Sequence, residues 1–80
     1  MKYKKANINE RNLSEESVSE YVNYIKDKIT GNYEEEYKEI EQLSFKFKIS
    51  RPENQKDILH KIVDITCYCR DNYLKNKDEI

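Results

Sequence analysis

The sequence predicts a small all-α protein with three helices, and three observations support this prediction. The chain has 80 residues but contains only one glycine and one proline, the residues that most often interrupt helices. Charged residues make up 39% of it, and most of them are lysine and glutamate, which favour helix. Apolar residues recur three and four positions apart in separate stretches. A chain of this length has room for one hydrophobic core, so we expect one domain.

The first helix is predicted to begin after Ser14, whose hydroxyl is a good N-cap, and to end near Gly31, which can adopt a left-handed C-cap conformation. Leu13 is placed to pack on Val18 as a hydrophobic staple. The apolar stripe of this helix consists of Val18, Tyr21, Val22, Ile25 and Ile29.

The second helix is predicted to follow almost at once. Asn32 is its expected N-cap, and Glu35 completes a capping-box pattern. A turn this short predicts that the first two helices form an antiparallel hairpin. The stripe expected to face the core consists of Tyr33, Tyr37, Ile40, Leu43 and Phe47.

Residues 43–49 allow two interpretations. Apolar and polar side chains alternate there, which is typical of a half-buried strand, but a strand needs a partner and the rest of the chain offers only a weak one. We therefore favour a helix that continues through this segment, with the short strand as the alternative. In the helix, Phe45 and Ile49 fall on the side opposite Ile40, because each residue turns the helix by about 100°. The helical interpretation thus predicts a second apolar seam.

The third helix is predicted to be the longest. Ser50 with Glu53 is expected to form a capping box, and Pro52 is tolerated in the first turn. Its apolar face is broad enough to contact two neighbouring helices. This face consists of Ile58, Leu59, Ile62, Val63, Thr66, Cys69 and Tyr73, with Ile65 at its margin.

We place a single helical domain at residues 13–75, between a flexible basic arm at 1–12 and a polar tail at 76–80.

No catalytic residues and no cofactor are predicted. The best candidates for metal ligands are His60, Asp64 and Cys67, which form one stripe of the third helix together with Asp71. One helix rarely completes a metal site, and the other helices offer no histidine or cysteine, so we interpret the stripe as a solvated margin of the core. His60 and Cys67 are also about 10 Å apart along the helix, too far for a catalytic hydrogen bond.

The two cysteines indicate a reducing compartment. Cys67 and Cys69 are two positions apart in a helix, which points their side chains in different directions and disfavours a disulfide. The N-terminus lacks the apolar stretch of an export signal, and no apolar run approaches the ~20 residues of a membrane span. We therefore expect a cytoplasmic protein with no membrane contact.

The remaining features favour binding to another protein. An acidic surface on the second helix should attract a basic partner, and the apolar seam needs to be covered by a partner or by a second copy of the chain. Tyrosines outside the apolar stripes offer further contact area. We predict a small adaptor, inhibitor, immunity or antitoxin-like protein that forms homodimers. The predicted contact residues are Glu34, Glu35, Glu36, Glu39, Tyr24, Phe45, Ile49 and Tyr68.

Two alternative functions stay open at this point. One is a dimeric nucleic-acid-associated regulator that uses the basic arm together with Lys46, Lys48 and Arg51. Its charge balance is unfavourable, since 16 acidic residues outnumber 15 basic ones and the second helix begins with glutamates that a DNA backbone would repel. The other is a structural component of a phage or mobile-element assembly.

Overall fold

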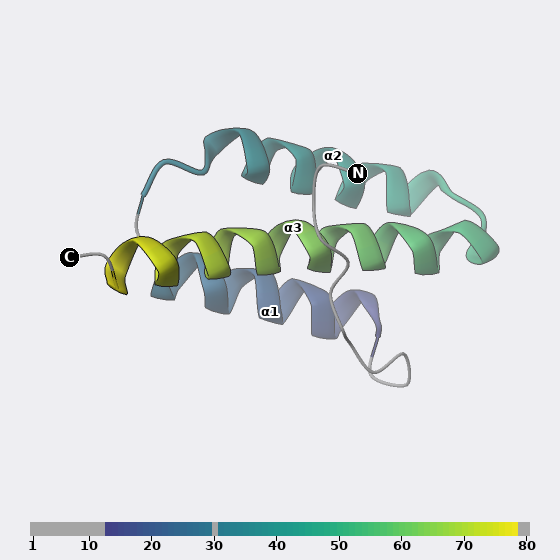
Figure 1. Ribbon diagram of the computed structural model, residues 1–80. Coiled ribbons are helices and arrows are strands. Elements are labelled where there is room, and N and C mark those ends of the chain that lie inside the picture. The colour runs from purple at the N-terminus through teal and green to yellow at the C-terminus, as the bar shows by residue number, and fades with distance from the viewer. Residues whose placement is uncertain (1–12, 30, 79–80) are drawn as a thin grey trace.

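The computed structural model of this protein describes residues 13–29 and 31–78. Within these ranges it contains three helices, α1 (Glu15–Lys28), α2 (Glu34–Ile49) and α3 (Pro52–Asp78). In Figure 1, α1 and α3 run in the same direction and α2 runs in the opposite direction. The predicted all-α fold is therefore confirmed. The predicted basic arm at 1–12 lies outside the described residues.

Helix α3 is the central element of the fold. It packs against both other helices, more extensively against α2 than against α1, whereas α1 and α2 have almost no close backbone contact with each other in the described part of the chain. Figure 1 shows α3 between the other two. The first two helices thus have the antiparallel directions of the predicted hairpin, but the packing that holds each of them is made with α3.

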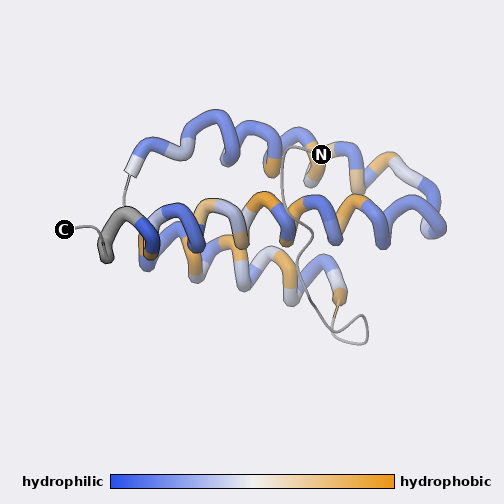
Figure 2. Tube along the Cα trace, in the orientation of Figure 1, coloured by the Kyte–Doolittle hydropathy of each residue, from blue (hydrophilic) through white to orange (hydrophobic). Residues whose placement is uncertain are grey.

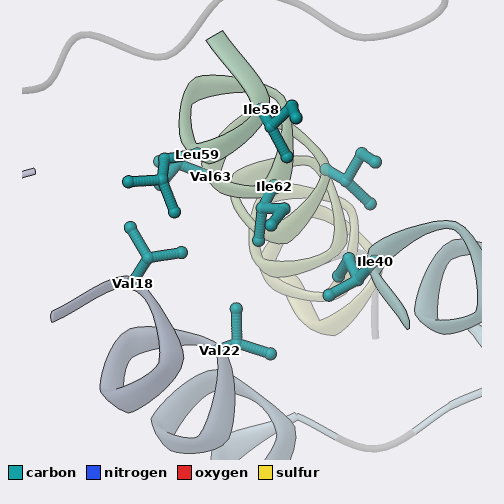
Figure 3. Close-up of a cluster of buried hydrophobic side chains, with 8 residues drawn as sticks. Val18, Val22, Ile40, Ile58, Leu59, Ile62 and Val63 are labelled. Atoms are coloured by element: carbon teal, nitrogen blue, oxygen red, sulfur yellow. The ribbon is translucent and has the colours of Figure 1, made fainter. Parts of the chain in front are cut away.

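The larger core cluster lies where the three helices meet. Val22 of α1 points toward Ile62 of α3, Val18 of α1 points toward Leu59, and Ile40 of α2 approaches Ile62 from the other side (Figure 3). A second cluster near the C-terminal half of α3 surrounds Cys69. The buried members of the first are Val18, Val22, Ile40, Ile58, Leu59, Ile62, Val63 and Ile65, and those of the second are Ile25, Ile29, Tyr33 and Cys69.

The predicted start of α1 is confirmed. The Ser14 hydroxyl accepts a hydrogen bond from the Ser17 backbone N–H, and the Ser17 hydroxyl accepts one from the Ser14 N–H, so the two serines form a capping box. Leu13 packs against the core next to this turn. The C-terminal end differs from the prediction, because Ile29 caps the helix in an extended conformation and Gly31, at φ 138°, lies two residues beyond that cap.

The predicted caps of the other two helices are wrong. Helix α2 begins one residue later than expected, with Tyr33 rather than Asn32 at the N-cap and no side-chain cap. Helix α3 begins at Pro52, which is too late for a cap at Ser50. The Ser50 hydroxyl instead donates to the Lys46 carbonyl at 2.6 Å, and thus closes the end of α2. In the short connection between α2 and α3, the Ser50 side chain therefore caps the end of α2 and not the start of α3.

Residues 43–49 are helical, as the favoured interpretation predicted. The side chain of Gln55, in the first turns of α3, donates to the Phe47 carbonyl at 3.0 Å and satisfies another acceptor at the end of α2. Helix α3 continues through Asp78, so the first part of the predicted tail at 76–80 belongs to the helix. Ile65, predicted at the margin of the α3 face, is 3% exposed and belongs to the core.

Candidate partner-binding site

Most of the predicted contact residues lie on α2, and the helix divides into two halves of different character. Its first half is acidic, with five glutamates and one lysine, Lys38, and its last turn carries Lys46 and Lys48. Figure 2 shows that the first half is hydrophilic along most of its length, whereas hydrophobic positions appear toward the end of the helix. The two halves therefore offer different chemistry to a partner.

The acidic half begins with three consecutive glutamates. Glu34 and Glu35 are exposed, while Glu36 and Glu39 are half-buried against the rest of the fold. Tyr33, the N-cap, makes no side-chain cap to the first backbone N–H groups, so the glutamates supply the negative charge that the positive end of a helix favours. The charge of Glu36 also helps to raise the pKa of the neighbouring Tyr33 hydroxyl, after the larger effect of burial.

Phe45 and Ile49 are the most exposed large apolar side chains in the described residues. Phe45 is 67% exposed and Ile49 is 72% exposed. They are four positions apart on a helix, so their side chains are neighbours on the side of α2 opposite Ile40. The predicted second seam therefore exists, and no other part of the described chain covers it.

A groove runs between α1 and α2, above the N-terminal half of α3. Its volume is about 390 Å³, and its floor includes the apolar side chains of Val22, Ile40 and Ile62. Phe45 forms part of one wall, next to Ser44. The groove exists because α1 and α2 each pack on α3 but do not close on each other. The sequence pattern does not predict this groove, because the apolar stripes of the helices do not specify the distance between α1 and α2.

The rim of the groove carries charges of both signs. Glu15 and Lys26 belong to α1, and Glu41 and Lys48 belong to α2. Lys26 reaches across to α2, with its Nζ 4.8 Å from the centroid of the Tyr37 ring, a distance typical of a cation–π interaction. This contact links the two helices, while the rest of the rim is open to charged or polar groups of a partner.

The two predicted contact tyrosines are exposed but do not line the groove. Tyr24 is 57% exposed on α1, and Tyr68 is 40% exposed on α3. Lys28 Nζ lies 5.5 Å from the centroid of the Tyr24 ring, so part of this aromatic face is occupied within its own helix. The structure thus unites Phe45 and Ile49 in one surface and leaves Tyr24 and Tyr68 on separate elements.

Two of the predicted metal-stripe residues belong to a polar network instead. Tyr21 Oη lies 3.4 Å from Cys67 Sγ and accepts a hydrogen bond from Arg70 Nη1 at 2.8 Å. Arg70 also contacts the Asp71 carboxylate at 3.1 Å. Burial and the Cys67 hydrogen bond raise the pKa of Tyr21 to about 12. The network joins α1 to α3 and was missed because its members are far apart in the sequence.

The stripe of His60, Asp64, Cys67 and Asp71 does not assemble into a metal site. Among the described residues, no three histidine, cysteine or acidic side chains lie close enough together to hold an ion. Both cysteines are free thiols, with Cys67 half-buried and Cys69 fully buried. Cys69 belongs to the core, as its place on the predicted apolar face of α3 indicated, and burial raises the pKa of its thiol to about 11.

Comparison with protein-family models, with curated proteins and with solved structures gives no match for this chain. In the described ranges, none of the helices combines the length and the apolar character needed to cross a membrane.

Proposed function

We propose that this protein is a non-enzymatic module that binds a basic surface of another protein through the acidic half of α2. The observation that carries the proposal is the position of Glu34 and Glu35, which are exposed in the first turn of α2. The N-cap, Tyr33, makes no side-chain hydrogen bond there, so the glutamates supply the negative charge at this end of the helix. Glu36 and Glu39 extend the same negative surface toward the fold. Concentrated charge of one sign steers a partner of the opposite sign and fixes its orientation.

The supporting observations favour a protein as the partner. The surface is a convex helix rather than a cavity, and a helix face suits contact over an extended area better than the enclosure of a small molecule. The acidic charges would repel nucleic acid. Adaptors, inhibitors, immunity proteins and antitoxins all act by covering a surface of their target, and a rigid bundle of this size is sufficient for such a role. The two free thiols favour a reducing compartment such as the cytoplasm.

The test is affinity purification from cells of the source organism, with the partner identified by mass spectrometry and its affinity then measured with purified proteins. The decisive variant is E34Q/E35Q/E36Q, which removes three charges and preserves side-chain size. The matched control is E16Q/E20Q/E53Q, which removes three exposed glutamates elsewhere, two of them from the first turns of α1 and α3. Both variants change the net charge equally, so a difference between their affinities for the partner shows that the position of the removed charges matters.

We expect a basic partner that the wild type and the control retain and that E34Q/E35Q/E36Q binds at least about tenfold more weakly, which corresponds to roughly 1.4 kcal/mol. Far-UV circular dichroism checks that the variants keep their helices. Equal affinity of both variants for every partner recovered would refute the role of the acidic half. Tight binding of random-sequence duplex DNA at low salt would support the nucleic-acid regulator in its place.

A further inference from the structure

We infer that the apolar half of α2 binds a second copy of this chain, with the two α2 helices antiparallel and Phe45 at the two-fold axis. The exposed Phe45 belongs to the wall of the groove between α1 and α2. An apolar projection and a recess therefore lie on the same face. A two-fold symmetric interface needs one surface that complements itself, and a face that carries both a projection and a recess meets this need.

The charge pattern of α2 identifies the partner as another copy. An acidic and a basic residue flank Phe45 along α2, so two antiparallel copies that overlap around Phe45 bring unlike charges together, whereas two parallel copies in register would bring like charges together. Near Phe45, Glu41 lies four positions before it and Lys48 three positions after it, and all three side chains line the groove. A two-fold axis at Phe45 places Glu41 of each chain opposite Lys48 of the other.

The charges on the groove rim support the same occupant. Glu15 and Glu41 are balanced by Lys26 and Lys48, so the rim has no net charge that would select a strongly basic or strongly acidic helix. The apolar contact would come from Phe45 and Ile49 of both chains, which are 67% and 72% exposed in one chain alone. Apolar side chains of this size at the centre of an interface and charged pairs at its edge are typical of specific association.

Self-association at this face does not require the acidic half of α2 to bind a partner. With the axis at Phe45, the two helices overlap mainly in their second halves, and Glu34 and Glu35 lie toward the outer ends of the pair. A dimer would then display two acidic surfaces pointing away from each other. A partner with two basic sites would gain affinity from binding both of them.

The first test is the mass of the full chain in solution, measured by light scattering after size exclusion over micromolar to high-micromolar concentrations. We expect twice the 9.7 kDa of one chain. The Phe45→Ser variant should shift to the monomer mass, while Lys46→Ser, at the next position, which is also exposed but lies on another side of α2, should remain a dimer. A monomer at all concentrations would overturn the inference and leave the groove to a helix of a different protein.

A charge exchange tests the antiparallel orientation itself. Glu41→Lys alone and Lys48→Glu alone each place like charges opposite each other across the axis, and each should raise the dimer dissociation constant at least about fivefold. The double variant E41K/K48E restores unlike charges and should recover most of the wild-type value. A double variant weaker than both single variants would overturn the proposed orientation. The E34Q/E35Q/E36Q variant should stay dimeric, which separates this inference from the proposed function.

Discussion

The guanidinium of Arg70 donates a hydrogen bond of 2.8 Å to the Tyr21 hydroxyl and thereby joins α3 to α1. The same hydroxyl lies 3.4 Å from Cys67 Sγ, so it bonds to two side chains of α3. This network matters for the position of α1, because α1 packs on α3 and has almost no close backbone contact with α2. The polar contact adds a specific bond between α1 and α3 to the apolar packing of the two helices.

Replacing Tyr21 with phenylalanine should lower the free energy of unfolding by about 1 kcal/mol, the usual net contribution of a partly buried hydrogen bond. The aromatic ring stays in place, but Arg70 and Cys67 lose their partner. Urea unfolding followed by circular dichroism measures the change. The control is Tyr24→Phe, which removes a hydroxyl from an exposed ring and should leave the midpoint unchanged. Equal midpoints for both variants would show that the network does not stabilise the fold.

The stability of the protein should fall at alkaline pH. The folded state raises the pKa of Tyr21 from 10.0 to about 12 and that of Cys69 from 9.0 to about 11. A raised pKa means that the folded state holds the proton more tightly than the unfolded chain does. The stabilisation is therefore complete below the unfolded pKa values and is lost as pH rises from about 9 to about 12.

Urea unfolding at a series of pH values from about 8 to about 11 measures this loss. The Tyr21→Phe variant should lose less stability over the upper part of that range, because it lacks one of the titrating groups. A wild-type stability that stays constant or rises in this range would contradict the predicted direction of the shifts.

The two cysteines should differ in their reaction with a thiol reagent. Cys69 has 0% of its surface exposed, whereas Cys67 is half-buried beside Tyr21. In native buffer we expect iodoacetamide to modify Cys67 first, and Cys69 to react only when α3 opens. Mass spectrometry of digested samples gives the two rates separately. In urea the rates should become similar, and similar rates in native buffer would contradict the buried position of Cys69.

Gly31→Ala should destabilise the connection between α1 and α2. The φ of Gly31 is +138°, and a Cβ atom built there lies 3.0 Å from Cε2 of Tyr33, whose ring is buried and has little room to move. We expect a cost of about 1–3 kcal/mol, in the range of strained backbone positions. Thermal unfolding measures it, and Asn32→Ala, at the exposed next position, provides the control. An unchanged melting temperature for Gly31→Ala would contradict the strain.

Ile62 is the core residue whose truncation should cost most. It is 3% exposed and lies where side chains of all three helices meet (Figure 3). Ile62→Ala should lower the free energy of unfolding by about 2–5 kcal/mol, a large part of the stability of a small domain. Leu74→Ala, at a position that is 48% exposed on the same helix, should change it much less. Circular dichroism during thermal unfolding compares the two variants.

The sequence was sufficient to predict features that depend on neighbouring residues. The cap at Ser14 and the helical state of residues 43–49 follow from local pattern, and both are confirmed. The exposure of Phe45 and Ile49 follows directly from the helical period once the segment is known to be a helix. The cap predicted at Ser50 was wrong because a capping residue in a short connection can bond to either adjoining helix, and the Ser50 hydroxyl bonds to the Lys46 carbonyl of α2. The cap predicted at Asn32 was wrong because α2 begins one residue later, with Tyr33 at the N-cap.

The groove and the Tyr21 network could not be predicted in the same way. The groove depends on how far apart α1 and α2 lie on α3, a distance set by the side chains of all three helices together. The network joins residues separated by more than forty positions, and no local pattern indicates such a pair. Of the candidate site, the sequence therefore predicted the exposed residues but not the recess beside them.

The central position of α3 has a consequence for the order in which the molecule opens. Because α1 and α2 each pack mainly on α3 and have little close backbone contact with each other, either one can detach while most of the other's packing stays in place, and local unfolding has two routes. The α2–α3 pair has the more extensive contact and the shorter connection, so amide protons of α1 should exchange with solvent sooner than those of the other two helices. Detachment of α1 would expose Val63 and Leu59 and remove one wall of the groove. The groove would therefore exist only while α1, the least tightly held of the three helices, is in place.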